Sequence, residues 1–199
     1  MEFAKESDLQ EKKIELIDMY VSSSNLEDIC KMVDDVNYEL SKNVNFFIKP
    51  SNELKLINEM IPALFEIFSQ KNKRFMFDHT INVVNYIIKL VNPWFTPEIS
   101  DMLCNFVTNS VRFQKEFAYQ AFVTLIEAYP KQITICMPKL VPFISGDVND
   151  ISPNVKNNAS KALELLLNCS GNNDLNVFIP VVMKGLKDHS VIYDAIESL

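Results

Sequence analysis

Two histidines, His79 and His189, are the only imidazole groups in the chain that could support acid–base or metal chemistry. They lie far apart in the sequence, and neither belongs to a metal-binding arrangement such as HExxH, in which two histidines share one helix face. We therefore expect both to be surface or helix-capping residues, and we expect no metal site.

Carboxylates are the other groups that could act as general acids or bases. They are adjacent at Asp34-Asp35 and closely spaced at Asp147 and Asp150. Two catalytic carboxylates need a cleft that moves their pKa values apart, and a helix face or a turn does not provide one by itself. These aspartates are therefore expected to be solvated, and no arrangement of Ser, His and Asp suggests a nucleophile. We expect the protein not to be an enzyme.

The four cysteines are too widely spaced to form a zinc site or a local disulfide framework, which would need CxxC-type spacing. They are Cys30, Cys104, Cys136 and Cys169. We expect buried free thiols in a reducing compartment. The first residues are charged and are not a signal peptide, and no apolar run approaches the length of a membrane span. We therefore expect a cytoplasmic location and no membrane partner.

Glycine is scarce: the 199 residues contain three, at Gly146, Gly171 and Gly185. Glycine-rich loops hold the phosphates of nucleotides, and the sequence contains neither GxGxxG nor GxxxxGK[ST]. We therefore expect no cofactor and no small-molecule substrate. Few glycines also mean few hairpin turns, which favours an all-α fold.

The elements that must position any functional residue are short helices with polar turns between them. A possible capping box at Ser7 begins a helix that extends to about Val21, and Asn25 can cap a second helix that extends to about Lys42. Eight further helices follow from about Asn52, the last beginning near Ser190. Their apolar residues recur with the period of an α-helix.

The helices repeat in pairs. Three of them contain the same local pattern, around Pro62, Pro138 and Pro180, and Asp101 occupies the corresponding place between the first two. The interval is about 37 to 42 residues, which is the range of HEAT and armadillo repeats. Because proline inside a helix removes a hydrogen bond and clashes with the preceding turn, we interpret the recurring proline as a shared kink.

These observations predict an all-α, HEAT/armadillo-like solenoid of antiparallel helix pairs with a helical N-terminal cap; a single irregular helical bundle is the alternative. The cap and its connector would occupy residues 1–50 and the repeats residues 51–199. The expected repeats cover approximately 54–91, 92–129, 130–170 and 171–199.

From residue 92 onward the pattern resembles consecutive HEAT repeats of translation elongation factor 3. The motifs that carry the resemblance are Asn92-Pro93, Phe113-Gln114-Lys115-Glu116, Met137-Pro138-Lys139-Leu140-Val141-Pro142, Asn154-Val155-Lys156-Asn157-Asn158-Ala159 and Phe178-Ile179-Pro180. Residues 54–91 resemble the preceding repeat more weakly, and residues 1–50 do not match. In that family the HEAT segment is a ribosome-contacting arm, and ATP hydrolysis takes place in two downstream nucleotide cassettes. The resemblance therefore implies that this chain corresponds to the arm.

The chain departs from the family pattern in three ways. It contains no nucleotide-binding motif, it ends inside a repeat, and Asp101 stands where the motif expects proline. We therefore expect a fragment, a diverged stand-alone arm or a partner of a larger assembly, without ATPase activity of its own. A generic HEAT-repeat protein–protein scaffold, unrelated to translation, is the alternative function.

Basic residues cluster at turns that stacking would align along one side of the solenoid. We call this set the basic ridge: Lys71, Lys73, Arg74, Arg112, Lys115 and Lys156. The net charge of −7, from 19 Lys and Arg against 26 Asp and Glu, argues against nonspecific nucleic-acid binding but not against a local patch. The ridge could contact rRNA phosphates or an acidic protein surface; ordinary solvated turn charge is the alternative.

Aromatic residues lie close to the basic ridge in the sequence. Phe75, Phe77 and Phe113 fall in the apolar register and are expected in the core rather than as platforms for nucleic-acid bases. Trp94 is expected to pack over the boundary between two repeats.

Overall fold

The computed structural model describes residues 25–42, 50–109, 112–171 and 175–187. Within these ranges every regular element is helical, which confirms the all-α prediction. The elements are α2 (Leu26–Leu40), α3 (Pro50–Lys55), the π-helical turn η1 (Leu56–Met60), α4 (Ile61–Ser69), the 3₁₀ turn η2 (Lys71–Met76), α5 (Phe77–Leu90), η3 (Pro93–Phe95), α6 (Thr96–Asn109), α7 (Arg112–Ala128), η4 (Ile133–Cys136), α8 (Met137–Ser145), α9 (Pro153–Cys169), η5 (Leu175–Val177) and α10 (Ile179–Lys187). The expected helices that begin near Ser7 and Ser190 lie outside the described residues.

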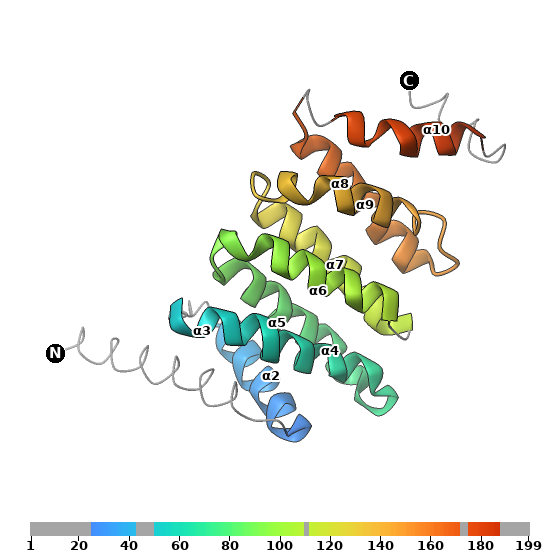
Figure 1. The fold of residues 1–199 in the computed structure, drawn as a ribbon. Helices are drawn as coiled ribbons and strands as arrows, with labels where there is room; N and C mark the ends of the chain where they lie inside the picture. Colours follow the sequence, from blue (N-terminus) through green and yellow to red (C-terminus); the bar gives the residue numbers. More distant parts are fainter. Residues whose placement is uncertain (1–24, 43–49, 110–111, 172–174, 188–199) are drawn as a thin grey trace.

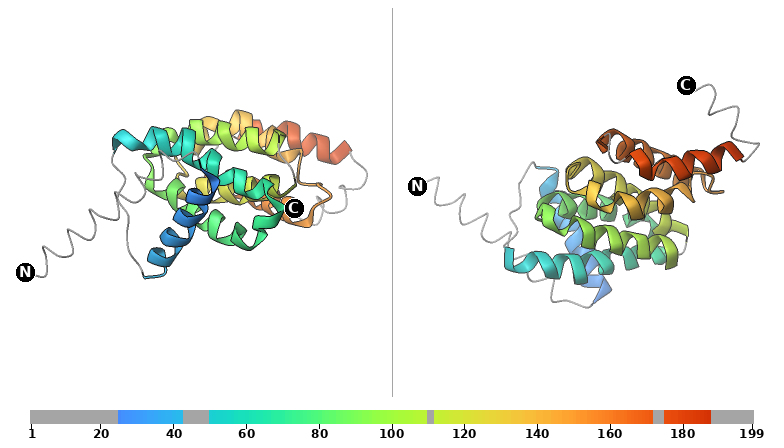
Figure 2. Two further views of the ribbon diagram at one scale, coloured as in Figure 1. Left: turned by 90° about the horizontal axis from the view of Figure 1, so that it is seen from below. Right: turned by 45° about the horizontal axis from the view of Figure 1, so that its top comes forward.

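The helices form two rows (Figures 1 and 2). The first row contains α4, α6, α8 and α10, and the second contains α5, α7 and α9. Each of α4, α6 and α8 packs against the second-row helix that follows it, and α7 also packs against both α5 and α9. This arrangement is the predicted solenoid of antiparallel helix pairs, in which stacked neighbours bury one continuous core.

Helix α2 is the described part of the predicted N-terminal cap. The Asn25 side chain accepts a hydrogen bond from the Glu27 amide, as expected for an N-cap. Val33 and Val36 of α2 are buried, and the helix packs against α5 and α4. It therefore covers the open end of the first helix pair, while the boundaries given above for the cap and the repeats remain predictions.

The recurring prolines are not a shared kink. Pro138 and Pro180 are the second residues of α8 and α10. The 3₁₀ turn η4 directly precedes α8, and η5 is separated from α10 by one turn residue. In the first turn of a helix the backbone N–H groups have no intrahelical acceptor, so proline, which lacks an N–H, is tolerated there. Pro62 differs because the π-helical turn η1 precedes it, and the Ile61 amide donates to the Leu56 carbonyl.

The structure also corrects the place of Asp101. The second residue of α6 is Pro97, so Pro97 and not Asp101 corresponds to Pro62, Pro138 and Pro180. Asp101 lies one turn further along α6, where it forms an exposed ion pair with Lys139 of α8. With Pro97 in place, all four first-row helices begin with the same local sequence feature.

Six phenylalanines join the first two helix pairs. We call this group the phenylalanine cluster: Phe65 and Phe68 of α4, Phe77 of α5, Phe106 of α6, and Phe113 and Phe117 of α7. Phe65 stacks on Phe106 with ring centroids 4.1 Å apart, and Phe68 stacks on Phe117 at 4.2 Å. Aromatic pairs in this geometry add to the free energy of burial, so the cluster holds the two pairs in a fixed relation.

Candidate partner-binding edge

The turns inside the helix pairs lie along one edge of the solenoid, on the right in Figure 1. We call it the turn edge; it comprises η2, the start of α7, the loop 146–152 and the start of α9. Side chains connect neighbouring turns directly. The Arg74 guanidinium lies 4.4 Å from the centre of the Phe113 ring, and Asn154 donates a 2.6 Å hydrogen bond to Glu116. The edge is therefore one connected surface.

Members of the basic ridge occupy this edge but differ in environment. Lys71 and Arg74 are exposed in η2, and Lys73 beside them is half-buried. Lys156 is exposed in the first turn of α9. The side chain of Arg112 lies outside the described part of the structure. The three cations of η2 are thus the densest positive charge that the described residues bring to the turn edge.

Lys115 serves an internal ion-pair network. Its Nζ donates to Asp147 at 2.7 Å and to Asp150 at 2.6 Å, and the buried Tyr119 hydroxyl donates to the second oxygen of Asp147 at 2.6 Å. We call these four residues the Asp147 cluster. Partial burial alone would lower the pKa of Lys115, but the hydrogen bonds to the two carboxylates outweigh it and raise that pKa. The two aspartates, expected to be solvated, instead anchor the loop 146–152 to α7.

A hollow of about 380 Å³ lies beside Arg74 on the same edge. Besides phenylalanine rings it is lined by Arg74, Asp78, Glu116 and Asn154. Because its lining contains two carboxylates and one guanidinium, this hollow does not favour a phosphate group. Phosphate contacts on the turn edge would instead involve the exposed Lys71 of η2 and the half-buried Lys73 beside it.

Phe75 does not lie in the core, where the apolar register predicts it. Its side chain is 76% exposed, whereas Phe77 is buried and Phe113 is half-buried against the core, as expected. The prediction assumes α-helical spacing, but Phe75 lies in η2, a 3₁₀ turn that follows a break at Gln70. With three residues per turn the side chain points away from the core.

Trp94 also differs from the prediction that it packs over a boundary between repeats. It lies in η3 and is 82% exposed. Ile135 occupies the matching place in η4 and is 73% exposed. Both residues lie where the chain passes from one helix pair to the next, at the edge opposite the turn edge.

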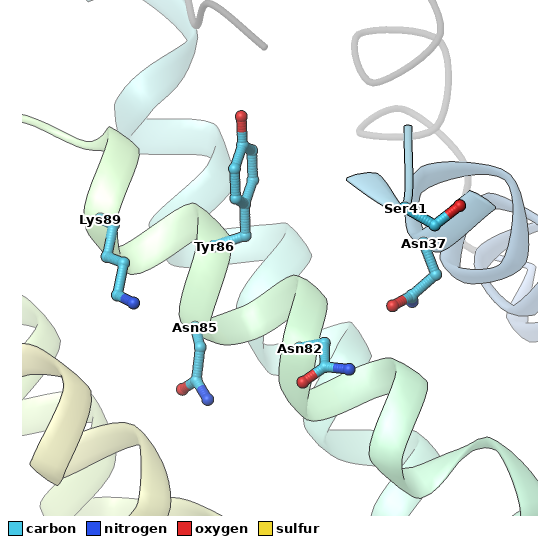
Figure 3. A pocket seen from close by; sticks show the side chains of 6 residues that line it. All are labelled: Asn37, Ser41, Asn82, Asn85, Tyr86 and Lys89. Carbon is cyan, nitrogen blue, oxygen red and sulfur yellow. The ribbon is translucent and has the colours of Figure 1, made fainter. Parts of the chain in front are cut away.

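A polar pocket of about 480 Å³ lies between α2 and α5 (Figure 3). Its lining consists of Asn37, Ser41, Asn82, Asn85, Tyr86 and Lys89. Asn37 is held in place because its amide donates to the carbonyls of Val33 and His79. The sequence motifs do not indicate this pocket, although Asn82, Asn85 and Lys89 recur at helical spacing on one face of α5.

The buried side-chain oxygen of Asn85 should lower the stability of the fold, which can be tested. Its Oδ1 atom is buried and has no hydrogen-bond partner among the described residues. An unsatisfied buried acceptor costs about 1–3 kcal/mol, so Asn85→Leu should raise the free energy of unfolding by about 1 kcal/mol, and Asn85→Asp should lower it. The matched control is Asn82→Leu on the same face, where the side chain is exposed. Equal effects of the two leucine substitutions in denaturant titrations would contradict this interpretation.

Comparison with known families decides the classification. The family model described as "EF3 N-terminal HEAT repeat" matches residues 42–163, which is more than half of the chain. The chain belongs to this family. The match includes residues 54–91, where the sequence resemblance is weaker, and ends before Phe178-Ile179-Pro180.

Three EF3 proteins are similar to this chain. Elongation factor 3 of Pneumocystis carinii is 27% identical over 118 residues, or 59% of the chain. Elongation factor 3A of Saccharomyces cerevisiae is 23% identical over 76% of the chain, and elongation factor 3 of Gonapodya prolifera is 25% identical over 70%. The matches span 11%, 14% and 13% of those proteins, respectively. No solved structure matches the chain.

The histidines and cysteines of this EF3-type HEAT segment differ in their burial. His79 lies on the surface with its Nδ1 atom 3.3 Å from Asp34, and His189 lies outside the described residues. Cys30 and Cys104 are buried free thiols as expected, and Cys136 and Cys169 are half-buried. Burial raises the pKa of Cys104 to about 11, so its thiol stays protonated at neutral pH.

The described residues contain no group of three His, Cys, Asp or Glu side chains placed to hold a metal ion. Among the helices of the described ranges, none is both long and apolar enough to cross a membrane.

Proposed function

We propose that this EF3-type HEAT segment is a non-catalytic interaction module that docks on the ribosome in the cytoplasm. The contact is made by the turn edge, with Lys71, Lys73 and Lys156 directed at rRNA phosphates. Lys115 contributes by holding the loop 146–152 in place, because its charge is already compensated by two carboxylates.

The observation that carries the proposal is the turn η2, which places three cations on the turn edge of an otherwise acidic chain. An overall net charge of −7 opposes nonspecific binding to nucleic acid, so binding depends on this local patch. The similar proteins are elongation factors, which links the family to translation. The chain has no GxxxxGK[ST] motif, and ATP hydrolysis is not part of its proposed role.

Co-sedimentation with purified ribosomes tests this proposal. Binding should weaken steeply with salt, because each lysine that pairs with a phosphate releases counterions. The double variant Lys71→Glu/Lys73→Glu should bind about tenfold more weakly or worse, and its salt slope should fall by about two, one for each lysine–phosphate pair that the variant removes. Arg112→Glu, tested separately, should also weaken binding.

The matched control is Lys55→Glu/Lys131→Glu, which makes the same change in net charge at exposed lysines outside the turn edge. It should bind like the unmodified chain apart from a small general electrostatic loss. Equal weakening by the two double variants would place the contact elsewhere. Absence of co-sedimentation at low salt would contradict ribosome docking and favour a generic protein–protein scaffold.

A further inference from the structure

Phe75 is an exposed aromatic residue that lies among cations. Its ring is 76% exposed, and it directly follows Lys71, Lys73 and Arg74 in the same 3₁₀ turn. The Arg74 guanidinium lies over the half-buried Phe113 ring, which orients the start of α7 toward η2. The turn therefore presents one exposed aromatic ring together with cationic side chains at the turn edge.

We propose that Phe75 is a stacking platform for an unpaired base of single-stranded RNA, with Lys71 and Lys73 contacting the phosphates on either side. This inference rests on the proposed function and specifies the chemistry of its partner. Single-stranded nucleic acids are bound by aromatic rings that stack on base faces and by cations that follow the backbone. A duplex would offer the lysines its phosphates but would keep its base faces covered by stacking.

The charge of the turn favours RNA over an acidic protein segment. An acidic peptide would pair with the lysines, but it would leave the Phe75 ring in water. A neutral apolar partner would cover Phe75, but it would bury the flanking ammonium groups without compensation. A nucleotide satisfies both, because it carries an aromatic face and a phosphate within one unit.

The single tryptophan of the chain makes this stacking measurable. Trp94 is 82% exposed at the opposite edge, so in the unmodified chain it reports on a surface away from η2. The double variant Trp94→Phe/Phe75→Trp moves the only indole to the proposed platform. A short single-stranded RNA oligonucleotide should quench the relocated indole and leave the fluorescence of the unmodified chain nearly unchanged.

Two further probes separate stacking from charge. An abasic oligomer with the same number of phosphates should bind without quenching, and the same RNA annealed to its complement should quench little. In binding titrations with the single strand, Phe75→Ala should weaken affinity about tenfold, while Phe75→Tyr should restore it. Ile135→Trp in the Trp94→Phe background is the matched control, an indole at an exposed position of the opposite edge.

Three results would contradict the inference. Quenching by the abasic oligomer equal to that by RNA would mean that no base stacks, and so would equal affinities of Phe75→Ala and Phe75→Tyr. Competition by poly-glutamate as effective as that by RNA would indicate an acidic protein partner.

The result with ribosomes separates this inference from the proposed function. If ribosome binding is lost in Lys71→Glu/Lys73→Glu but unchanged in Phe75→Ala, docking stands and stacking is wrong. If RNA quenches the relocated indole and ribosomes still do not co-sediment, stacking stands and ribosome docking is wrong.

Discussion

Phe68→Ala should lower the free energy of unfolding by about 4 kcal/mol, within the range measured for phenylalanine truncations in protein cores. Phe68 is 1% exposed and contacts three rings of the phenylalanine cluster. Removing it leaves a cavity at the junction of α4, α5 and α7, where stacked rings from different helices cannot easily collapse to fill the space. Denaturant titration followed by circular dichroism measures the loss.

Phe75→Ala is the matched control for this substitution. It makes the same chemical change seven positions later, but the ring there is 76% exposed, so stability should change by less than about 0.5 kcal/mol. Because solenoid stability is a sum over units and their interfaces, Phe68→Ala should also reduce hydrogen-exchange protection in α4 and α5 more than in α9. A uniform loss of protection would contradict the role given to the cluster.

Asp147→Ala should be the second largest loss, about 2–3 kcal/mol. The substitution leaves the fully buried Tyr119 hydroxyl without its acceptor and removes one of the two carboxylates that pair with Lys115. Breaking a buried pair in this way can cost about 3–5 kcal/mol, and partial exposure of the Lys115 and Asp147 side chains, 23% and 21%, reduces that figure. Thermal and denaturant unfolding measure it.

Asp101→Ala is the control for the Asp147 substitution. It also removes an aspartate that pairs with a lysine of a neighbouring helix, but both side chains of the Asp101–Lys139 pair are more than half exposed. Exposed pairs contribute about 0–1 kcal/mol, so this variant should be nearly as stable as the unmodified chain. Similar losses at Asp101 and Asp147 would mean that the Asp147 cluster does not stabilise the turn edge.

The Asp147 cluster also predicts a pH dependence. The pKa of Tyr119 is raised mainly by burial and secondly by the hydrogen bond to Asp147. The pKa of Lys115 is also raised. Both groups hold their protons more tightly when folded than when unfolded, so their contribution is complete below about pH 10 and is lost as the pH rises further. The stability of Tyr119→Phe should therefore fall less between about pH 9 and pH 11 than that of the unmodified chain.

Most of the fold follows from the sequence because its determinants are local. Helical periodicity locates α5, α6, α7 and α9, and Asn25 caps α2 as its side chain predicts. The failures arise where α-helical spacing is interrupted. The apolar register points to Asp101, although the start of α6, marked by Pro97, defines the repeat. The same register predicts a core position for Phe75, although that residue lies in a 3₁₀ turn.

The candidate edge could be predicted only in outline. Alternating helix pairs place the basic turns on one side, which local patterns are enough to suggest. The partner of each side chain depends on how neighbouring pairs stack, and Lys115 meets Asp147 and Asp150 across separations of 32 and 35 residues. No local pattern predicts such a pairing, so the sequence could not distinguish Lys115, whose charge two carboxylates compensate, from the cations of η2.

The two exposed edges of the solenoid are separated by the length of its second-row helices. Helices α5 and α7 have 14 and 17 residues, and at 1.5 Å per residue they hold the edges about 21 to 26 Å apart. The length of the helices therefore sets the distance between Phe75 on one edge and Trp94 on the other. Adding one whole turn to both helices of a pair would increase the distance between the two edges by about 5 Å. The contacts between neighbouring pairs would stay in register.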